Sequence, residues 1–296
     1  MQTKHQIQQL LTSAGLSPNK RLGQHFLIDL NLMRLLVDSA HIKNSDVVLE
    51  VGCGTGSLTE ALADKAGEVI AVERDEALAK IAAAQLAKAN NVQVISTDIL
   101  ETKHTISQAV TKAAQLCQRK LRGRILLVAN LPYNIASPLM LNLLMGSLIV
   151  DGMYITVQEE VGERITAEPG QKHYGTLSIS LTATGDVKPL RTLQPAVFWP
   201  QPGVGSAMIG FIRSHKKAAR IKNSEVFKEV VGVFLRHRRK MLKACTKLLA
   251  GRLAEISDWH EIFDRCSVDP RQRPDQVSPE GYIDIANLCN ERLDKV

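Results

Sequence analysis

Short apolar runs alternate with helical patterns along the first two thirds of the chain. Runs rich in Val, Ile and Leu predict buried strands at 47–51, 69–72, 92–96, 125–129 and 153–157, and two further strands are expected at 187–193 and 207–212. Between the first five, apolar positions recur at helical spacing, at about 57–65, 77–90, 102–122 and 137–148. This alternation predicts an α/β fold with a Rossmann-like, parallel, doubly wound sheet, which the last two strands close as a pair.

From residue 223 onward the pattern predicts helices only. One stripe of a continuous helix would carry apolar residues, namely Phe227, Val231, Phe234, Met241, Cys245 and Leu248. The opposite stripe would carry a basic tetrad, defined as Arg236, Lys240, Lys243 and Lys247. With further helices near 254–265 and 279–293, we expect two domains: residues 1–213, and a small all-α domain at 214–296.

Charge is distributed unevenly between these parts. The net charge is +7 overall. Residues 1–213 carry 20 Lys and Arg against 18 Asp and Glu, whereas residues 214–247 carry 11 against 2. Such a block indicates either a polyanionic partner such as nucleic acid or a solvated basic face.

Composition excludes several classes of protein. No apolar run approaches the roughly 18 residues of a membrane span, and the polar N-terminus has no signal-peptide core. The five cysteines are scattered and form no Cys-x-x-Cys pair, which argues against a disulfide framework and a zinc site. We expect a cytoplasmic protein without a membrane segment or a bound metal.

Candidate chemistry begins where the strand at 125–129 ends in Asn130-Leu131-Pro132-Tyr133. Pro132 has no N–H and must stop the strand ladder. The Asn130 side-chain oxygen and the Leu131 carbonyl are able to accept the two hydrogens of an exocyclic amine, such as the adenine 6-amino group, while Tyr133 stacks on the base. Taken alone, Asn-x-Pro is also a common way to end a strand.

A glycine loop follows the first strand, with Gly52, Gly54 and Gly56 in the order Gly-x-Gly-x-Gly. Its glycines permit close backbone approach to a ligand beside a helix N-terminus. Glu73 ends the next strand about 20 residues on, where a carboxylate accepts ribose hydroxyls; the alternative is a solvated acid. Asp98, after the third strand, is either an acceptor for an adenine amino group or a helix cap.

Two loops add candidates. Residues 19–27 form either an arm that packs on the core or a flap over a cofactor. Residues 195–202 hold Phe198 and Trp199 among prolines. Phe198 is either a second stacking face for a base or a buried aromatic staple.

Together these motifs resemble S-adenosylmethionine-dependent methyltransferases that act on amino groups. Longer matches are similar to the KsgA/RsmA-type small-subunit (16S) ribosomal RNA adenine dimethyltransferases. They are Leu22-Gly-Gln-His-Phe-Leu27, Pro169-Gly-Gln-Lys-x-Tyr-Gly175, Phe198-x-Pro-x-Pro-x-Val-x-Ser206 and Arg273-Pro-Asp-Gln-Val-Ser-Pro-Glu280. The similarity runs over nearly the whole chain.

The resemblance implies dimethylation of two adjacent adenosines in the 3′-terminal hairpin of 16S rRNA by a protein expected to be monomeric. It assigns S-adenosylmethionine binding to His25, Leu27, Gly52, Glu73, Asp98 and Asn130, with Gly54 in the same loop. It assigns the target adenine to Asn130, Leu131, Pro132, Tyr133 and Phe198, and we expect the basic tetrad to bind RNA.

Some residues depart from the family pattern. Cys53 stands where proline is common, and Gly203 and Gly205 stand where lysine and aspartate are usual, which puts RNA contacts near Phe198 in doubt. Three other functions remain open. They are the related 23S rRNA dimethyltransferases of macrolide resistance, a non-catalytic RNA-binding assembly factor on the same fold, and an NAD-dependent enzyme, which the glycine spacing disfavours.

Overall fold

A computed structural model describes residues 1–19 and 23–294, so Leu22, which opens the predicted flap motif, lies outside the described residues. The chain forms two compact units. The first comprises Met1–Gly162 and Lys188–Ile212, and the second comprises Glu163–Val187 and the residues from Arg213 onward. The sequence predicted a single boundary after residue 213, whereas the structure groups 163–187 with the helical part.

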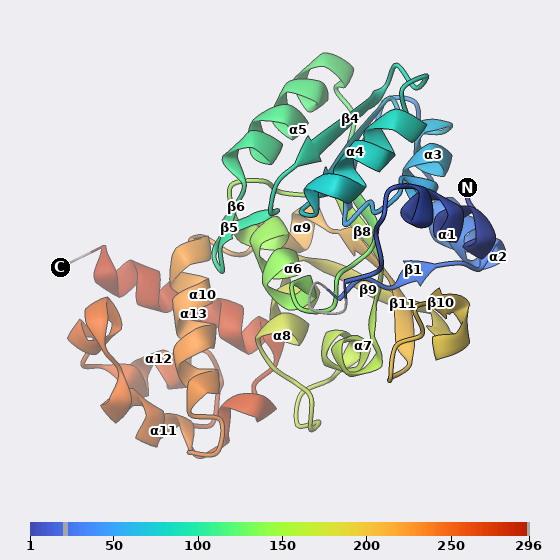
Figure 1. Ribbon diagram of the computed structural model, residues 1–296. Helices are drawn as coiled ribbons and strands as arrows, with labels where there is room; N and C mark the ends of the chain where they lie inside the picture. Colours follow the sequence, from blue (N-terminus) through green and yellow to red (C-terminus); the bar gives the residue numbers. More distant parts are fainter. Residues whose placement is uncertain (20–22, 295–296) are drawn as a thin grey trace. The chain divides into compact units, whose positions relative to one another are not determined.

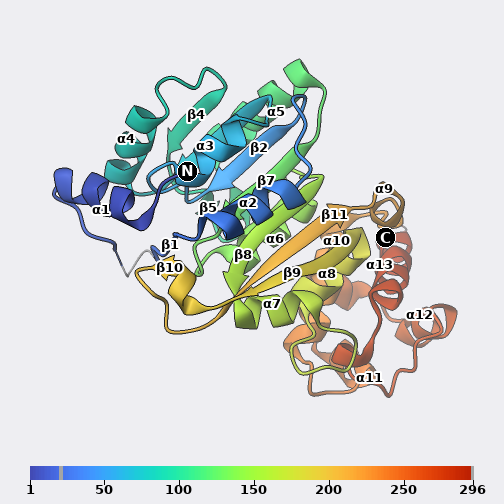
Figure 2. The ribbon, with the colours of Figure 1, turned by 90° about the vertical axis from the view of Figure 1, so that its right-hand side faces the viewer.

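A seven-stranded sheet forms the centre of the first unit (Figures 1 and 2). In spatial order its strands are β4 (Val92–Ser96), β3 (Glu68–Glu73), β2 (Val47–Val51), β7 (Ile125–Asn130), β8 (Gly152–Gln158), β11 (Ser206–Arg213) and β9 (Gly185–Leu193). The first five run parallel, and β11 is antiparallel to β8. The predicted α/β sheet is confirmed, and the closing pair makes it mixed rather than wholly parallel.

The strand order decides where a ligand binds. From β2 the chain proceeds outward through β3 to β4, and it then returns to β7 on the other side of β2. Helices on either side of such a reversal leave a crevice at the carboxyl ends of the two central strands. The loops after β2 and β7, which carry the glycine motif and Asn130, therefore meet at this crevice.

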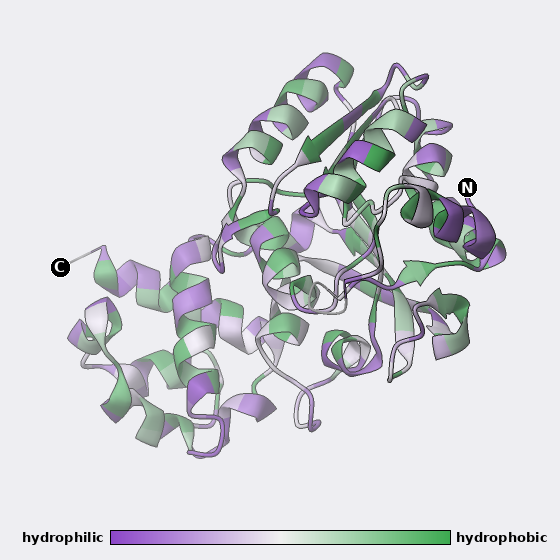
Figure 3. Cartoon of the chain, viewed as in Figure 1, coloured by the Kyte–Doolittle hydropathy of each residue, from purple (hydrophilic) through white to green (hydrophobic). Residues whose placement is uncertain are grey.

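Helices cover the sheet of the first unit. They are α2 (Leu30–Ser39), α3 (Ser57–Ala63), α4 (Glu76–Gln85), α5 (Gln108–Leu121) and α6 (Ala136–Met145), while α1 (Lys4–Ser13) packs beside α4 through Ile7, Leu11 and Leu78. Short acids fix two of the starts, because the Asp29 carboxylate accepts from the N–H groups of residues 31 and 32, and Asp75 accepts from those of residues 77 and 78. In Figure 3 the sheet strands are largely hydrophobic, as expected for a sheet buried between helices.

Two small strand pairs accompany the main sheet. β1 (Phe26–Leu27) pairs antiparallel with β10 (Phe198–Trp199), and the short helix η2 (Pro195–Val197) precedes β10. β5 (Leu100–Thr102) pairs with β6 (Thr105–Ile106). The helix predicted over 102–122 therefore begins only at Gln108, because β-branched residues at its start form a hairpin instead.

The second unit is helical. After α7 (Glu159–Thr166), which contains the boundary, it comprises α8 (Thr176–Thr184), α9 (His215–Ala218), α10 (Ser224–Arg236), α11 (Leu242–Cys245), η3 (Thr246–Leu248), η4 (Gly251–Glu255), α12 (Trp259–Arg265), η5 (Pro274–Gln276) and α13 (Pro279–Leu293). The buried Tyr174 hydroxyl donates to the Val277 carbonyl at 2.8 Å. This bond ties the loop at 169–175 to the C-terminal helices.

The predicted continuous helix from 223 to 248 is wrong. It ends at Arg236, and α11 begins only at Leu242. The N–H of Leu242 donates to the Gln272 carbonyl at 2.9 Å, and that of Lys243 donates to the Pro270 carbonyl at 3.0 Å. A distant segment thus satisfies backbone groups that a continuous helix would have used internally. Consequently Met241 is 48% exposed rather than packed, while Leu242 is fully buried.

No helix among residues 1–19 and 23–294 has both the length and the apolar character needed to span a membrane. The cysteines of the chain are all free thiols.

Candidate functional site

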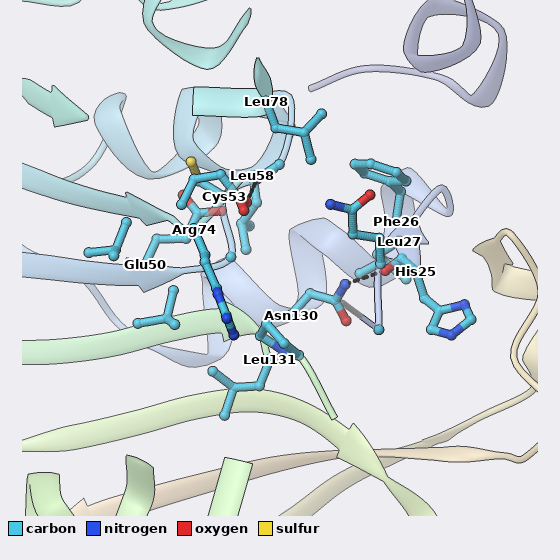
Figure 4. A pocket seen from close by; sticks show the side chains of 18 of the residues that line it. His25, Phe26, Leu27, Glu50, Cys53, Leu58, Arg74, Leu78, Asn130 and Leu131 are labelled. Atoms are coloured by element: carbon cyan, nitrogen blue, oxygen red, sulfur yellow. Dashed lines mark hydrogen bonds between the residues drawn. The ribbon is translucent and has the colours of Figure 1, made fainter. Parts of the chain in front are cut away.

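A cavity lies at the carboxyl ends of β2, β3 and β7 in the first unit (Figure 4). Its wall consists mainly of residues 23–27, 50–55, 57–58, 72–74, 97–99 and 130–135. The structure therefore brings together His25, Leu27, Gly52, Gly54, Glu73, Asp98, Asn130, Leu131, Pro132 and Tyr133. Of the residues predicted for the reaction centre, only Phe198 does not line the cavity.

The glycine loop needs its glycines. Gly52 and Gly54 have φ angles of 78° and 58°, in the left-handed region that favours glycine. A Cβ on Gly52 would lie 3.0 Å from the Pro132 side chain, and one on Gly54 would lie 2.8 Å from the Phe26 ring. The loop after β2 therefore packs directly on the loop after β7 and on the segment at 23–27.

Glu73 holds this loop in place. Its side chain is 7% exposed. Oε2 accepts from the Gly54 N–H at 2.9 Å, and Oε1 accepts from the Asp75 N–H at 2.9 Å. Burial raises the pKa of this carboxyl. Each oxygen retains a further lone pair for a ligand hydroxyl, so the predicted ribose role is compatible with a structural one.

Asp98 occupies the turn between β4 and β5. Its Oδ1 accepts from the Leu100 N–H at 3.0 Å, and its Oδ2 pairs with an Arg74 guanidinium nitrogen at 3.2 Å. Asp98 therefore caps a turn rather than a helix. Both Asp98 and its partner Arg74 line the cavity.

The Asn130 amide is fixed at both ends. Its Nδ2 donates to the His25 carbonyl at 2.7 Å, and its Oδ1 accepts from the Thr156 hydroxyl. A carbonyl can only accept, so the bond to His25 determines which end of the amide is nitrogen. The Thr156 carbonyl also accepts from the Leu131 N–H at 3.2 Å. Thr156 thus orients both predicted acceptors, Asn130 Oδ1 and the Leu131 peptide.

Tyr133 is partly buried beside this amide. Its hydroxyl lies 2.8 Å from Ser206 Oγ, and burial raises its pKa. Its ring stacks with His25 at a centroid distance of 5.4 Å. His25 Nδ1 in turn lies 2.6 Å from the Pro200 carbonyl, which can only accept, so Nδ1 carries the proton.

The prediction that Phe198 stacks on a base is not supported. Its side chain is 2% exposed and belongs to a hydrophobic core cluster that includes Leu27 and Leu193. Pairing of β10 with β1 sets Phe198 opposite Leu27. It is the buried aromatic staple that the sequence left as the alternative.

Sequence reasoning missed two buried polar residues at the site. Glu50, the last residue but one of β2, lines the cavity and is 2% exposed. Thr156, in β8, is fully buried. A charged residue within an otherwise apolar strand was an available signal for Glu50, whereas the role of Thr156 depends on the register that sets Asn130 opposite it.

The basic tetrad lies in the second unit, where all four side chains are exposed. Arg236 ends α10, Lys240 lies in the following turn, Lys243 belongs to α11 and Lys247 to η3. They do not form the predicted stripe of one helix, because that helix is interrupted. Among the described residues, no group of three or more His, Cys, Asp or Glu side chains is arranged to hold a metal ion.

The fold is that of a methyltransferase of the doubly wound α/β class. It is similar to a crystal structure of a dimethyladenosine transferase from Plasmodium falciparum, with a TM-score of 0.72 and 21% identity, covering 89% of this chain and 97% of that chain. It is also similar to the 23S rRNA methyltransferase ErmE, with a TM-score of 0.62 and 22% identity, covering 91% and 99%. At these identities the likeness concerns the fold.

The sequence assigns the family. The family model described as ribosomal RNA adenine dimethylase matches residues 15–290. Relatives named ribosomal RNA small subunit methyltransferase A, from Bacillus mycoides and Bacillus cereus, are each 34% identical over 290 residues, covering 96% of this chain and 96% of the relative. The chain belongs to the ribosomal RNA adenine dimethylase family, and it is by family an enzyme. The resemblance found in the sequence is thereby confirmed.

Proposed function

We propose that this protein transfers methyl groups from S-adenosylmethionine to the 6-amino groups of two adjacent adenosines in the 3′-terminal hairpin of 16S rRNA. The observation that carries the proposal is the fixed Asn130-Leu131 pair of acceptors at the end of β7, at the wall of the cavity. Its relatives named for the small ribosomal subunit support the choice of substrate. We expect it to act as a monomer in the cytoplasm, without a metal.

The cavity suits a cationic nucleoside cofactor. Three acids, Glu50, Glu73 and Asp98, stand at its wall. A ligand with positive charge offsets such a concentration of acids. His25, Leu27, Gly52, Gly54, Glu73, Asp98 and Asn130 are the residues that would hold S-adenosylmethionine, which supplies an electrophilic methyl group when bound.

Asn130 and Leu131 activate the amine in this proposal. The lone pair of the adenine amino group is delocalised into the ring, so the group is a poor nucleophile. If Asn130 Oδ1 and the Leu131 carbonyl each accept one amino hydrogen, the nitrogen becomes more tetrahedral and its lone pair is available for attack. Pro132 fixes the turn that presents both acceptors, and Tyr133 supplies a ring for the base to stack on.

No strong base is required. The amine becomes a methylated ammonium, which is acidic enough to release its proton to water. The fixed amide instead supplies orientation, and a positioned acceptor needs no rearrangement during the reaction. The base must leave its stack to reach the acceptors, and a hairpin loop lowers that cost.

The second unit supplies RNA affinity in this proposal. The exposed basic tetrad would contact phosphates, which give binding that depends strongly on salt. The tetrad spans the end of α10, a turn, α11 and η3. Its four charges therefore project from separate short elements rather than from one face of a single helix.

The test is transfer of labelled methyl from S-adenosylmethionine to small ribosomal subunits that lack this modification, followed by nuclease mapping. We expect label in two adjacent adenosines near the 3′ end of 16S rRNA. Label only in 23S rRNA would favour the macrolide-resistance type of enzyme. The 23S rRNA methyltransferase ErmE has a fold similar to that of this chain. Binding of RNA and cofactor without label would favour a non-catalytic assembly factor.

A further inference from the structure

Three neighbouring strands of the first unit, β7, β8 and β11, change from apolar to polar at the same edge of the sheet (Figure 2). On one face they carry side chains of a single hydrophobic cluster, namely Val128, Tyr154 and Met208. Two residues closer to the edge, and therefore on the same face, they carry Asn130, Thr156 and Ser206. In register, Asn130 pairs with Thr156, and Thr156 pairs with Met208. The polar side chains thus continue an apolar face of the sheet.

Burial alone does not explain the two hydroxyl residues in this row. Thr156 and Ser206 are both fully buried, and Val or Ala would fill the same space without a polar group to remove from water. Each hydroxyl instead has a partner in the loop after β7. Thr156 donates to Asn130 Oδ1, and Ser206 Oγ lies 2.8 Å from the Tyr133 hydroxyl. The hydroxyls therefore hold the first and the last residue of the Asn-Leu-Pro-Tyr loop.

The bond from Thr156 has a defined direction and a defined consequence. Asn130 Nδ2 donates to the His25 carbonyl at 2.7 Å (Figure 4), so the oxygen at the other end of the amide faces Thr156 and can only accept. One lone pair of Oδ1 is used by Thr156, and the other stays available for an amine hydrogen. With a bond at each end, the amide cannot rotate without losing both.

The Tyr133 ring is held in a similar way. Its hydroxyl contacts Ser206, and its face stacks with His25 at a centroid distance of 5.4 Å. A ring with a contact at its tip and a contact on its face has a fixed plane. The amine acceptor and the stacking ring, which serve the same base in the proposed function, are thus each held by one buried hydroxyl.

We propose that Thr156 and Ser206 are positioning residues for methyl transfer. Thr156 holds the Asn130 oxygen ready to accept an amine hydrogen, and Ser206 holds the Tyr133 ring ready to stack on the base. These roles rest on the proposed function. Neither side chain lines the cavity, so both act through the loop. Since groups fixed in advance need no rearrangement during the reaction, loss of either hydroxyl lowers the rate of transfer, while RNA affinity, which phosphate contacts dominate, is retained.

The first test is single-turnover methylation of small ribosomal subunits that lack the modification, at saturating S-adenosylmethionine. Thr156→Val removes the hydroxyl, keeps the size of the side chain and leaves the main-chain carbonyl that accepts from the Leu131 N–H at 3.2 Å. We expect the rate to fall roughly 10–100-fold, and Thr156→Ser to stay close to wild type. If Thr156→Val does not fold, Thr156→Cys, whose thiol is a weak donor, should be slower than Thr156→Ser. A wild-type rate without the hydroxyl would overturn the role of Thr156.

Double-mutant cycles separate positioning from general destabilisation. Ser206→Ala and Tyr133→Phe each remove one end of the same contact and keep the ring, so they should lower the rate by similar factors, and the double variant should lose no more. Thr156→Val should likewise cost nothing further in an Asn130→Ala background. Rate losses that add in either cycle would overturn the proposal, because the hydroxyl would then act through some other group.

Matched controls come from the second unit. Thr184→Val and Ser178→Ala also delete buried hydroxyls, which donate to the carbonyls of Ser180 at 2.7 Å and Arg164 at 2.6 Å. They should lower the thermal unfolding temperature without changing the methylation rate, whereas a rate loss as large as that of Thr156→Val would reduce the proposed positioning to general destabilisation. Binding of S-adenosylmethionine and of RNA is measured for each variant and should be unchanged. Absence of methyl transfer by the wild-type protein would refute the proposed function itself, whereas transfer that survives loss of both hydroxyls refutes the positioning roles alone.

Discussion

Replacing Asn130 by Ala removes a side chain that the structure ties both to the segment at 23–27 and to β8. The substitution deletes the bond from Nδ2 to the His25 carbonyl and the bond that Oδ1 accepts from Thr156. It also deletes the proposed acceptor for one hydrogen of the adenine amine. The variant therefore combines a structural loss with a chemical one, and the two differ in size and in the assay that reports them.

The chemical loss should dominate. Removing one positioned hydrogen bond to a transition state lowers the rate about 10²–10³-fold, which raises the activation free energy by roughly 3–4 kcal/mol. The structural loss leaves the Thr156 hydroxyl and the His25 carbonyl without their partner, which costs about 1–3 kcal/mol of unfolding free energy. We expect the methyl-transfer rate to fall at least about 100-fold, while the protein remains folded and binds RNA as before.

The assay is single-turnover methylation at saturating S-adenosylmethionine, alongside RNA binding and thermal unfolding. Asn142→Ala is the matched control, because the Asn142 amide also makes two hydrogen bonds to carbonyls, those of Lys103 at 3.1 Å and Pro138 at 2.8 Å, and Asn142 does not line the cavity. It should lower stability similarly without a rate loss. An Asn130→Ala rate within a few-fold of wild type would contradict amine activation, and loss of RNA binding would assign Asn130 to recognition instead.

Three further predictions follow from charge. Glu73→Ala should weaken S-adenosylmethionine binding by at least about 10-fold in equilibrium titration, because a wall acid and an anchor of the glycine loop are both lost; unchanged affinity would remove Glu73 from the cofactor site. Replacing the basic tetrad by Ala should reduce the slope of log affinity for 16S rRNA against log salt by about 3, and an unchanged slope would mean a merely solvated face. Burial acts to raise the pKa of Asp46, but hydrogen bonds from Arg124 and from two backbone N–H groups outweigh it and lower that pKa. Asp46 therefore stabilises the fold above about pH 4, and this contribution disappears as pH falls through the lowered value. Asp46→Asn should lower the unfolding free energy at pH 7 and by a smaller amount at pH 3 in denaturant titrations, and an equal loss at both would exclude ionisation as the cause.

Sequence patterns predicted the structure correctly wherever residues close together in the sequence determine the local conformation. The apolar runs predicted the strands of the sheet, and the order of strands and helices predicted its doubly wound form. The glycine loop, Glu73 and the Asn130 loop all lie at the ends of predicted parallel strands, so the sequence alone predicts that they meet at one edge of the sheet. Hydropathy could not reveal the break after Arg236, because the backbone N–H groups of Leu242 and Lys243 bond to carbonyls about 30 residues further along the chain.

The sequence by itself determined the fold class, the family and most of the predicted residues that gather at the cavity, because each depends on local patterning or on motif spacing. Only the tertiary structure decided that Phe198 is buried opposite Leu27, that Thr156 orients the Asn130 amide, and that Glu50 is buried at the cavity wall. These facts depend on register between strands and on burial, which arise from contacts between residues far apart in the sequence. Such contacts also set the pKa of Glu50, since that value depends on how completely the fold removes its carboxyl from water.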